Sequence, residues 1–253
     1  MSKSIQEIKQ EFLNQPINNI NELIEKYIQD ERKGVKNIIE SYNNKFIKYK
    51  QELLRIENMK RYENEAYFQG KTLIAGIDEV GRGPFAGPVV TACVILPKDF
   101  QVLGINDSKK LSEKKREELF IKIKENALDI AINMEDNHVI DDINILEATK
   151  KSMIKNIEDL KNKPDYLILD SIHIDTDIPY ISMTKADEKS ISVASASIIA
   201  KVTRDEYMNK MHLLYPQYKF NENKGYGTKE HIEALKKYGP CPIHRNSFIK
   251  NYI

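Results

Sequence analysis

The sequence predicts an α/β domain, built as a mixed sheet covered by helices on both sides, behind a small all-helical N-terminal extension. Two observations support this prediction. Residues 1–66 contain one glycine and one proline, and their apolar residues recur at helical spacing. From Lys71 onward, short apolar runs alternate with helical patterns, as in α/β domains. We therefore assign 1–70 to the helical extension and 71–253 to the α/β domain.

The extension shows two apolar stripes in an otherwise polar sequence. Residues spaced by three or four positions fall on one face of an α-helix, so each stripe predicts an amphipathic helix. We expect two or three helices, forming a small bundle or a helical arm. The stripes consist of Ile20, Leu23, Ile24 and Ile28, and of Ile38, Ile39, Tyr42, Phe46 and Tyr49.

The α/β domain begins with two apolar runs joined by a short link, which favours an antiparallel hairpin. A further run ends at Asp170 and resembles a buried strand. The strands are expected at 72–77, 88–96, 129–134, 166–169 and 181–184.

Helical patterns separate and follow these strands. Ser112 is a suitable N-cap for the first helix, and Thr228 for the last, which stops at Gly239-Pro240. The helices are expected at 113–127, 141–161 and 189–214, with the last between Thr228 and Gly239.

Composition is that of a globular protein rather than a disordered one. Of the 253 residues, 41% are apolar and 30% are charged, with a net charge of +1. The global charge does not indicate a nucleic-acid partner, but residues 219–250 hold seven basic and three acidic residues. A second basic cluster spans 109–116. Each cluster is either a solvated face or a phosphate-binding surface.

The two cysteines, Cys93 and Cys241, form neither a metal-ligand pattern nor a disulfide framework, which fits a reducing compartment. Cys93 lies in an apolar run and is expected in the core. The polar start, MSKSIQEIKQ, is unlike a signal peptide. No apolar stretch approaches the ~18 residues of a membrane span. We expect a cytoplasmic protein without a membrane partner.

The segment IAGIDEVGRGPFAGPVV at 74–90 places Asp78 and Glu79 after an apolar run and before a loop rich in glycine and proline. The loop fits the pattern G-x-G-x-x-A, but β-rich sequence follows it where a dinucleotide site needs a helix. No phosphate-binding P-loop pattern occurs. The glycines either form a tight turn or let backbone groups approach a ligand closely.

Acidic residues stand near the ends of two predicted strands and before the long helix. Asp78, Asp170 and Asp187 would converge if these ends share one edge of the sheet. Converging carboxylates suit Mg²⁺ or Mn²⁺. The structural alternatives are a surface position for Glu79, a turn for Asp170 and a helix cap for Asp187. Other acids compete for the same role: Asp141, Asp142, Asp165, Asp175 and Asp177.

The stretch NKGYGT at 223–228 places Tyr226 between two glycines, beside a lysine and before a helix. An exposed tyrosine can present its ring to a sugar or base. The alternative is a tyrosine that packs over a turn.

Six motifs occur in order along residues 72–253: IAGIDEVGRGPFAGPVV, DSKKLS (107–112), LILDS (167–171), ASIIAKVTRD (196–205), NKGYGT and PIHRNSF (242–248). Together they resemble bacterial ribonuclease HII, the type 2 ribonuclease H. The Gly81-Arg82-Gly83 triplet distinguishes this group from ribonuclease HIII. The resemblance implies a ribonuclease H-like fold, with a mixed five-stranded sheet flanked by helices and a helical C-terminal part. Phe85 and Cys241 depart mildly from the family pattern, and the helical extension lies outside the shared core.

The resemblance also implies an activity and its residues. The enzyme would cleave the RNA strand of RNA/DNA hybrids and nick duplex DNA 5′ of single ribonucleotides, leaving 3′-OH and 5′-phosphate ends. It would serve in ribonucleotide removal and RNA primer removal. Two divalent cations, Mn²⁺ or Mg²⁺, would catalyse the hydrolysis of the phosphodiester bond. The family's roles fall on these residues: catalysis and metal binding on Asp78, Glu79, Asp170 and Asp187; 2′-OH recognition on Gly81, Arg82 and Gly83; sugar packing on Tyr226; phosphate binding on Ser108, Lys109 and the basic tail with Arg245.

Expected partners are RNA/DNA hybrid and ribonucleotide-containing duplex DNA, bound by a monomer. The resemblance allows a sliding-clamp contact, but the C-terminus FIKNYI shows no clear clamp motif. The main alternative is a nucleic-acid-binding module without catalysis, which would use Tyr226 and the basic tail. A structural protein is the third possibility, and it would leave the acids unexplained.

Overall fold

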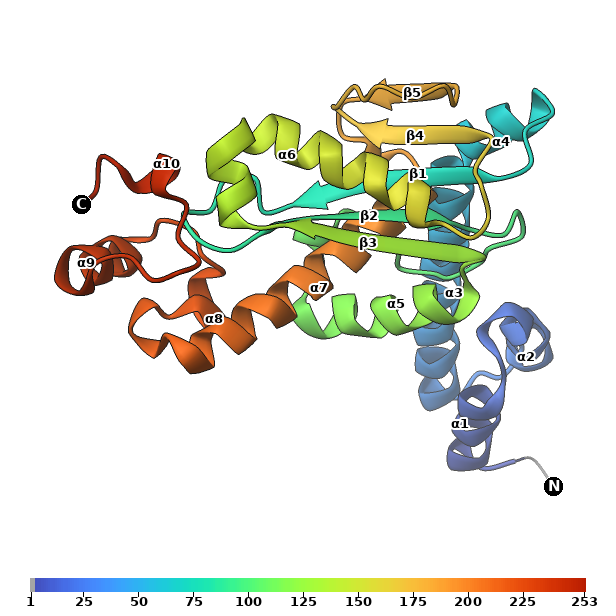
Figure 1. Ribbon diagram of the computed structural model, residues 1–253. Helices are drawn as coiled ribbons and strands as arrows, with labels where there is room; N and C mark the ends of the chain where they lie inside the picture. The colour runs from blue at the N-terminus through green and yellow to red at the C-terminus, as the bar shows by residue number, and fades with distance from the viewer. Residues whose placement is uncertain (1–2) are drawn as a thin grey trace. The chain divides into compact units, whose positions relative to one another are not determined.

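The computed structural model describes residues 3–253 (Figure 1). The chain divides into two compact units, Met1–Asn58 and Met59–Ile253. No helix within residues 3–253 combines the length and the apolar character needed to cross a membrane.

The first unit is helical, as predicted. It contains α1 (Ile5–Asn14), α2 (Ile20–Tyr27) and most of α3 (Lys33–Met59). Ser4 and Glu7 form a reciprocal capping box at the start of α1, which satisfies free backbone N–H groups there. The Phe12 ring packs 5.0 Å from the Tyr42 ring inside the small core of this unit. Most residues of the predicted stripes pack in this core, but Ile28 lies beyond the end of α2 and is 59% exposed.

The second unit begins with α4 (Arg61–Phe68), which a break at Lys60 separates from α3. Residues 3–70 thus hold four α-helices, one more than the upper expectation from the sequence.

A mixed five-stranded sheet follows, with strand order β3-β2-β1-β4-β5. Strand β2 pairs antiparallel with both β1 and β3, whereas β4 pairs parallel with β1 and β5. This confirms the predicted hairpin and the predicted fold class. The strands are β1 (Ile74–Val80), β2 (Val89–Ile95), β3 (Asp129–Glu135), β4 (Tyr166–Asp170) and β5 (Tyr180–Met183).

Helix α6 (Asn137–Asp159) covers one face of the sheet, while α7 (Ile191–Leu214) and α5 (Glu113–Asn126) cover the other (Figure 1). Helix α6 starts earlier than predicted because Asp136 caps it, accepting hydrogen bonds from two backbone N–H groups. A kink at Asn144, with φ 68°, divides it.

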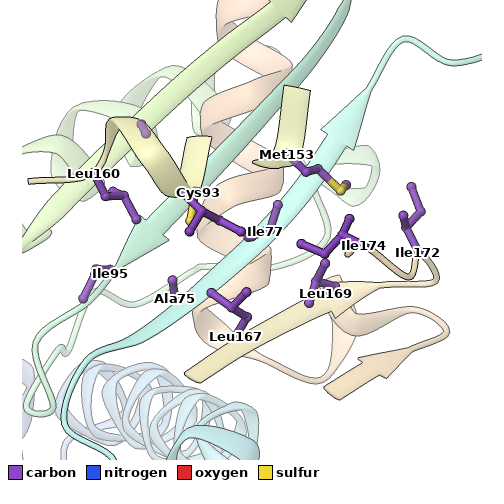
Figure 2. Close-up of a cluster of buried hydrophobic side chains, with 12 residues drawn as sticks. Ala75, Ile77, Cys93, Ile95, Met153, Leu160, Leu167, Leu169, Ile172 and Ile174 are labelled. Carbon is purple, nitrogen blue, oxygen red and sulfur yellow. The ribbon is translucent and has the colours of Figure 1, made fainter. Parts of the chain in front are cut away.

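The main core lies between the sheet and α6 (Figure 2). Ile77 and Leu169 of neighbouring strands point into it together with Met153 of α6. Cys93 is buried there, as the sequence predicts, and burial raises the pKa of its thiol. This apolar layer fixes the register of β1 against β4.

On the opposite face, the backbone of α7 lies directly against β1 at Gly76. A Cβ atom at Gly76 would stand 2.2 Å from the carbonyl carbon of Ser192, so only glycine fits here. Because side chains two apart in a strand share a face, Asp78 also points toward α7. The close crossing therefore places the start of α7 over the middle of β1, and α7 then runs along the strand until Arg204 meets Gly81.

The C-terminal part is helical and has its own apolar cluster around Tyr218 and Phe220. It contains α8 (Phe220–Asn223), α9 (Lys229–Tyr238) and α10 (Asn246–Ile249). Thr228 caps α9, as predicted.

We expect Gly76→Ala to lower the free energy of unfolding by about 1–3 kcal/mol or more, because the added methyl group must push α7 away from β1. Gly83→Ala is the matched control, since its Cβ would meet no atom closer than Tyr226 Cε1 at 3.9 Å. Urea unfolding of both variants measures the difference. Equal stability of the two variants would contradict the close crossing.

Candidate active site

Asp78 and Asp170 lie side by side where the pairing between β1 and β4 ends. Ile77 pairs with Leu169 in the parallel ladder, so the residue after each is an aspartate in the same register. The sequence placed Asp78 just after the strand, but in the structure Asp78 lies within β1. It pairs with Ala92, because the β1–β2 ladder continues to Val80.

Asp187 joins them from a 3₁₀ turn, Ala186–Glu188, directly before α7. The backbone N–H of Ala186 donates to Asp170 Oδ1 at 3.1 Å, which ties this turn to the end of β4. Asp187 does not cap α7, because the Ser190 side chain accepts from Val193 N in that position. The helix-cap interpretation of Asp187 is therefore wrong.

Two of the other acids that competed for this role, Asp141 and Asp165, accept hydrogen bonds from backbone N–H groups elsewhere. Asp141 accepts hydrogen bonds from the backbone N–H groups of Asn246 and Ser247 at the start of α10. Asp165 accepts from the backbone of Thr72 and Leu73, just before β1. These two carboxylates stabilise chain segments away from the Asp78–Asp170 pair.

Burial sets the electrostatics of the two acids in β1. Asp78 is 5% exposed, and burial together with the neighbouring Glu79 charge raises its pKa well above the ordinary value. Burial raises the pKa of Glu79 to about 7, although Arg82 Nη1 lies 3.5 Å from Glu79 Oε1. The other oxygen, Glu79 Oε2, is buried and has no hydrogen-bond partner among residues 3–253. The site therefore holds carboxylates that are costly to ionise and incompletely satisfied.

The sequence did not single out Asp107, yet it belongs to this cluster. Burial, with Asp107 and Asp170 nearby, raises the pKa of Asp187 to about 6. Lys109 balances part of this charge. Its burial opposes ionisation, but the carboxylates of Asp107, Asp187, Asp78 and Asp170 outweigh burial and raise its pKa. The DSKKLS motif contained Asp107, but only the fold shows that it reaches Asp187.

Ser108 and Lys109, predicted to hold phosphates, thus lie at the edge of the acid cluster. The Ser108 hydroxyl is buried against Ser197 Oγ, 3.0 Å away. Of these two residues, only Lys109 brings a positive charge close to the acids.

Glu63 of α4 is a second residue that the sequence did not indicate. Its Oε1 accepts from Ser190 Oγ at 2.5 Å, Ser192 Oγ at 2.6 Å and Ser192 N at 3.0 Å. A carboxylate at a helix N-terminus is stabilised by the free N–H groups and the helix dipole. Burial nevertheless raises the pKa of Glu63. Glu63 thereby anchors the start of the helix whose preceding turn carries Asp187.

Across residues 3–253, no three His, Cys, Asp or Glu side chains converge closely enough to hold a metal ion as they stand. The acids named above share one edge of the sheet and influence one another's ionisation, but their oxygens do not form a closed ligand set.

The glycine loop after β1 rests on a buried arginine, Arg204 of α7. Its guanidinium donates to the carbonyls of Pro88 at 3.0 Å, Ala86 at 3.1 Å and Lys224 at 2.9 Å. Gly81 has φ +91°, and a Cβ there would stand 2.2 Å from Arg204 Nε. Glycine is therefore needed at this position for both its conformation and its space.

Arg245 supports the same loop from the C-terminal side. It is fully buried and donates to the carbonyls of Gly87, Arg82 and Gly81 at 2.6–2.9 Å. The sequence predicted a phosphate-binding role for Arg245. In the structure its donors are occupied by backbone, because this arginine lies beneath the loop rather than on the surface.

The two arginines place positive charge under the loop. Burial lowers the pKa of Arg204 to about 10 and, with Arg204 nearby, that of Arg245 to about 9. Within the described part of the chain, the hydrogen bonds of both guanidiniums go to backbone carbonyls. At neutral pH both remain charged, so the loop sits over a positive potential that favours an anionic ligand.

Tyr226 lies beside this loop. The Phe85 N–H donates to the Gly225 carbonyl at 2.8 Å, which joins the two glycine-rich segments. The Tyr226 side chain is 45% exposed, and its Cε1 would lie 3.9 Å from a Cβ at Gly83. The ring is presented to solvent next to Gly83 instead of being packed over its own turn.

Comparisons with known proteins agree with this arrangement. The family model "Ribonuclease HII" matches residues 75–251, and "Ribonuclease HII N-terminal domain" matches residues 4–67. Ribonuclease HII of Enterococcus faecalis is 50% identical, covering 97% of this chain and 96% of that protein. Ribonuclease HII of Clostridioides difficile is 49% identical, covering 99% of each.

Solved structures share the fold. Ribonuclease H2 of Pyrococcus horikoshii matches with a TM-score of 0.59 and 28% identity, covering 70% of this chain and 93% of that one. The ribonuclease HII of Archaeoglobus fulgidus, solved in complex with PCNA, gives 0.59 and 28%, covering 69% and 94%. On the strength of its fold, its motifs and these matches, the chain belongs to the ribonuclease HII family, endonucleases that hydrolyse the RNA of RNA/DNA hybrids.

Proposed function

We propose that this enzyme also nicks duplex DNA on the 5′ side of a single embedded ribonucleotide, leaving a 3′-OH and a 5′-phosphate. The observation that carries the proposal is the meeting of the Gly81–Gly83 loop with the exposed Tyr226 ring, near the acids of β1. A lone ribonucleotide differs from its neighbours by its 2′-OH, which the minor groove exposes. Such an activity would serve the removal of ribonucleotides and RNA primers from DNA.

The loop suits recognition of one hydroxyl group. Gly83 has open space where a side chain would stand, so backbone N–H and C=O groups there can approach a sugar closely. Arg204 and Arg245 hold the carbonyls of the loop from below, which keeps its backbone in one conformation. Tyr226 would pack its ring on the sugar at the RNA–DNA junction. These contacts distinguish RNA from DNA without reading the base.

We further propose that Asp78, Glu79, Asp170 and Asp187 hold divalent cations, Mg²⁺ or Mn²⁺. The donor set fits, because hard cations prefer carboxylate oxygens and Glu79 Oε2 is buried without a hydrogen-bond partner in the described part of the chain. The raised pKa values of Asp78, Glu79 and Asp187 show mutual repulsion and desolvation that a bound cation would offset. Binding has to draw the carboxylates together, since no three of them converge as they stand.

Two bound cations would activate the attacking water and stabilise negative charge on the leaving 3′ oxygen. The chain's own residues orient the scissile phosphate. Lys109 keeps its positive charge beside the acids, because their carboxylates outweigh its burial and raise its pKa. The buried positive charge of Arg204 and Arg245 attracts a phosphate backbone that lies above the glycine loop. Nucleic-acid binding should therefore weaken as the salt concentration rises.

Incubation with duplex DNA that carries one ribonucleotide, in Mg²⁺, Mn²⁺ or EDTA, tests the proposal. We expect a nick 5′ of the ribonucleotide in the presence of a divalent cation and none in EDTA, resolved on a sequencing gel. Binding without any cleavage would favour a nucleic-acid-binding module instead.

Asp78→Asn is the matched variant for this experiment. It removes a charge of the proposed cation site while keeping the side chain's size, so cleavage should be abolished and binding of the duplex largely retained. Gel-shift and cleavage assays on the same preparation measure both. Retained turnover would refute the assignment of Asp78.

Tyr226→Ala should impair cleavage at a single ribonucleotide more than cleavage of a long hybrid, where junction packing is not needed at every step. Stacking on an aromatic ring contributes ~1–3 kcal/mol, so kcat/KM on the single-ribonucleotide duplex should fall roughly fivefold to a hundredfold. Tyr238→Ala, at an exposed tyrosine of α9, is the control. An equal loss on both substrates would argue against the junction role.

Asp187→Asn should stabilise the cation-free protein at high pH. The folded-state pKa of Asp187 is raised to about 6, so the folded chain binds more protons than the unfolded chain between about pH 4 and 6. Ionisation of Asp187 therefore costs stability as the pH rises through this window. Thermal unfolding in EDTA should show a gain for Asp187→Asn that is small at pH 4 and full at pH 8. A pH-independent difference would contradict the raised pKa.

A further inference from the structure

Two buried histidines lie directly beneath Tyr226. His231 of α9 is 0% exposed, and His244, just before α10, is 2% exposed. Their Nε2 atoms face each other at 2.9 Å. Aromatic rings of Tyr218, Phe220 and Phe85 surround the pair, with ring centroids within 6.0 Å of one or both imidazoles. Water is thereby kept from the contact between the two histidines.

The outer nitrogen of His231 fixes the position of its proton. His231 Nδ1 lies 2.9 Å from the carbonyl oxygen of Tyr226, and a carbonyl only accepts hydrogen bonds. Nδ1 must therefore carry the proton. In the neutral ring, His231 Nε2 is then an acceptor.

The outer nitrogen of His244 is fixed in the opposite sense. The backbone N–H of Cys241 points at His244 Nδ1 from 2.9 Å, so this nitrogen accepts. A weaker contact of 3.3 Å from Nδ1 to the Cys241 carbonyl would need a proton on the same nitrogen, facing that N–H. The Cys241 carbonyl already accepts from His244 N at 3.0 Å. His244 therefore carries its proton on Nε2.

The proton positions at the two Nδ1 atoms determine the hydrogen bond between the two Nε2 atoms. A hydrogen bond between two Nε2 atoms needs one proton, and His244 supplies it while His231 accepts it. Burial lowers the pKa of both imidazoles, that of His244 to about 4, so both rings are neutral near pH 7. A continuous chain of hydrogen bonds thus runs from Cys241 N–H through His244 and His231 to the Tyr226 carbonyl.

Tyr226 needs such support, because glycines flank it on both sides and its ring is presented to solvent. Its carbonyl accepts from Thr228 N at 2.8 Å and from the His231 ring. Without the histidine, the carbonyl would keep its contact with Thr228 N, and the Tyr226 N–H would keep its hydrogen bond to the Asn223 carbonyl at 2.9 Å, both within the same turn.

We propose that His231 and His244 are positioning residues that act through Tyr226, holding its backbone so that the ring meets the sugar at the RNA–DNA junction. This relay, defined as the hydrogen-bonded chain Cys241–His244–His231–Tyr226, sets the preference for single ribonucleotides over continuous hybrid. The inference rests on the proposed junction role of Tyr226.

The tautomers are measured first, by ¹⁵N NMR of the full-length protein labelled at histidine. We expect His231 to be protonated at Nδ1 alone and His244 at Nε2 alone at pH 7, with resonances assigned by single-histidine variants. The opposite tautomer on either ring, or a doubly protonated ring, overturns the relay. This measurement needs no variant to be active.

Activity is then compared on a single-ribonucleotide duplex and on a long hybrid. His231→Leu keeps the apolar volume but loses the donor to Tyr226, so the ratio of the two kcat/KM values should fall roughly fivefold to tenfold, as for one lost hydrogen bond. His231→Asn, whose side-chain N–H can take the place of Nδ1–H, should restore the ratio. His173→Leu, at an exposed histidine, is the control and should leave it unchanged.

Equal losses on both substrates with His231→Leu, or no rescue by His231→Asn, overturn the positioning role. Tyr226→Ala is assayed in parallel. If it changes both substrates equally, the junction role of Tyr226 fails, whereas the relay itself is still decided by the NMR tautomers.

Discussion

The contact of the α7 backbone with β1 at Gly76 is the constraint on which the rest of the catalytic unit depends. With no side chain between them, helix and strand approach until Ser192 lies over Gly76. The same strand carries Asp78 two residues later, and the turn before α7 carries Asp187. One close crossing therefore sets the distance between acids that are more than a hundred residues apart in the chain.

Buried charge is concentrated on both sides of this crossing, and the two groups are held in different ways. Burial and the neighbouring carboxylates raise the pKa values of the acids, which is typical of functional sites. Arg204 and Arg245 are buried as well, but each is saturated by backbone carbonyls of the glycine loop. The acids are thus left incompletely satisfied, while the two arginines fix the shape of the glycine loop beside them.

Elements outside the sheet support the site through buried hydrogen bonds. Glu63 of α4 holds the first residues of α7, and His231 of α9 holds the carbonyl of Tyr226. In each case an exposed or reactive group is positioned by a buried polar partner from another element. Buried polar groups in satisfied networks restrict a structure to one geometry, which a functional site requires.

The sequence by itself determined the fold class, the hairpin, the capped helices and the family, because strand and helix periodicity, caps and ordered motifs are local signals. It also identified candidate site residues, namely Asp78, Asp170, Asp187 and Tyr226. Only the tertiary structure decided that β1 continues through Glu79 and that Arg245 lies under the loop. It also showed that Asp107 and His231 contact residues of the site, and that Glu63 holds the start of α7. Burial and hydrogen-bond partners arise between segments distant in the chain, so residue type and spacing cannot reveal them.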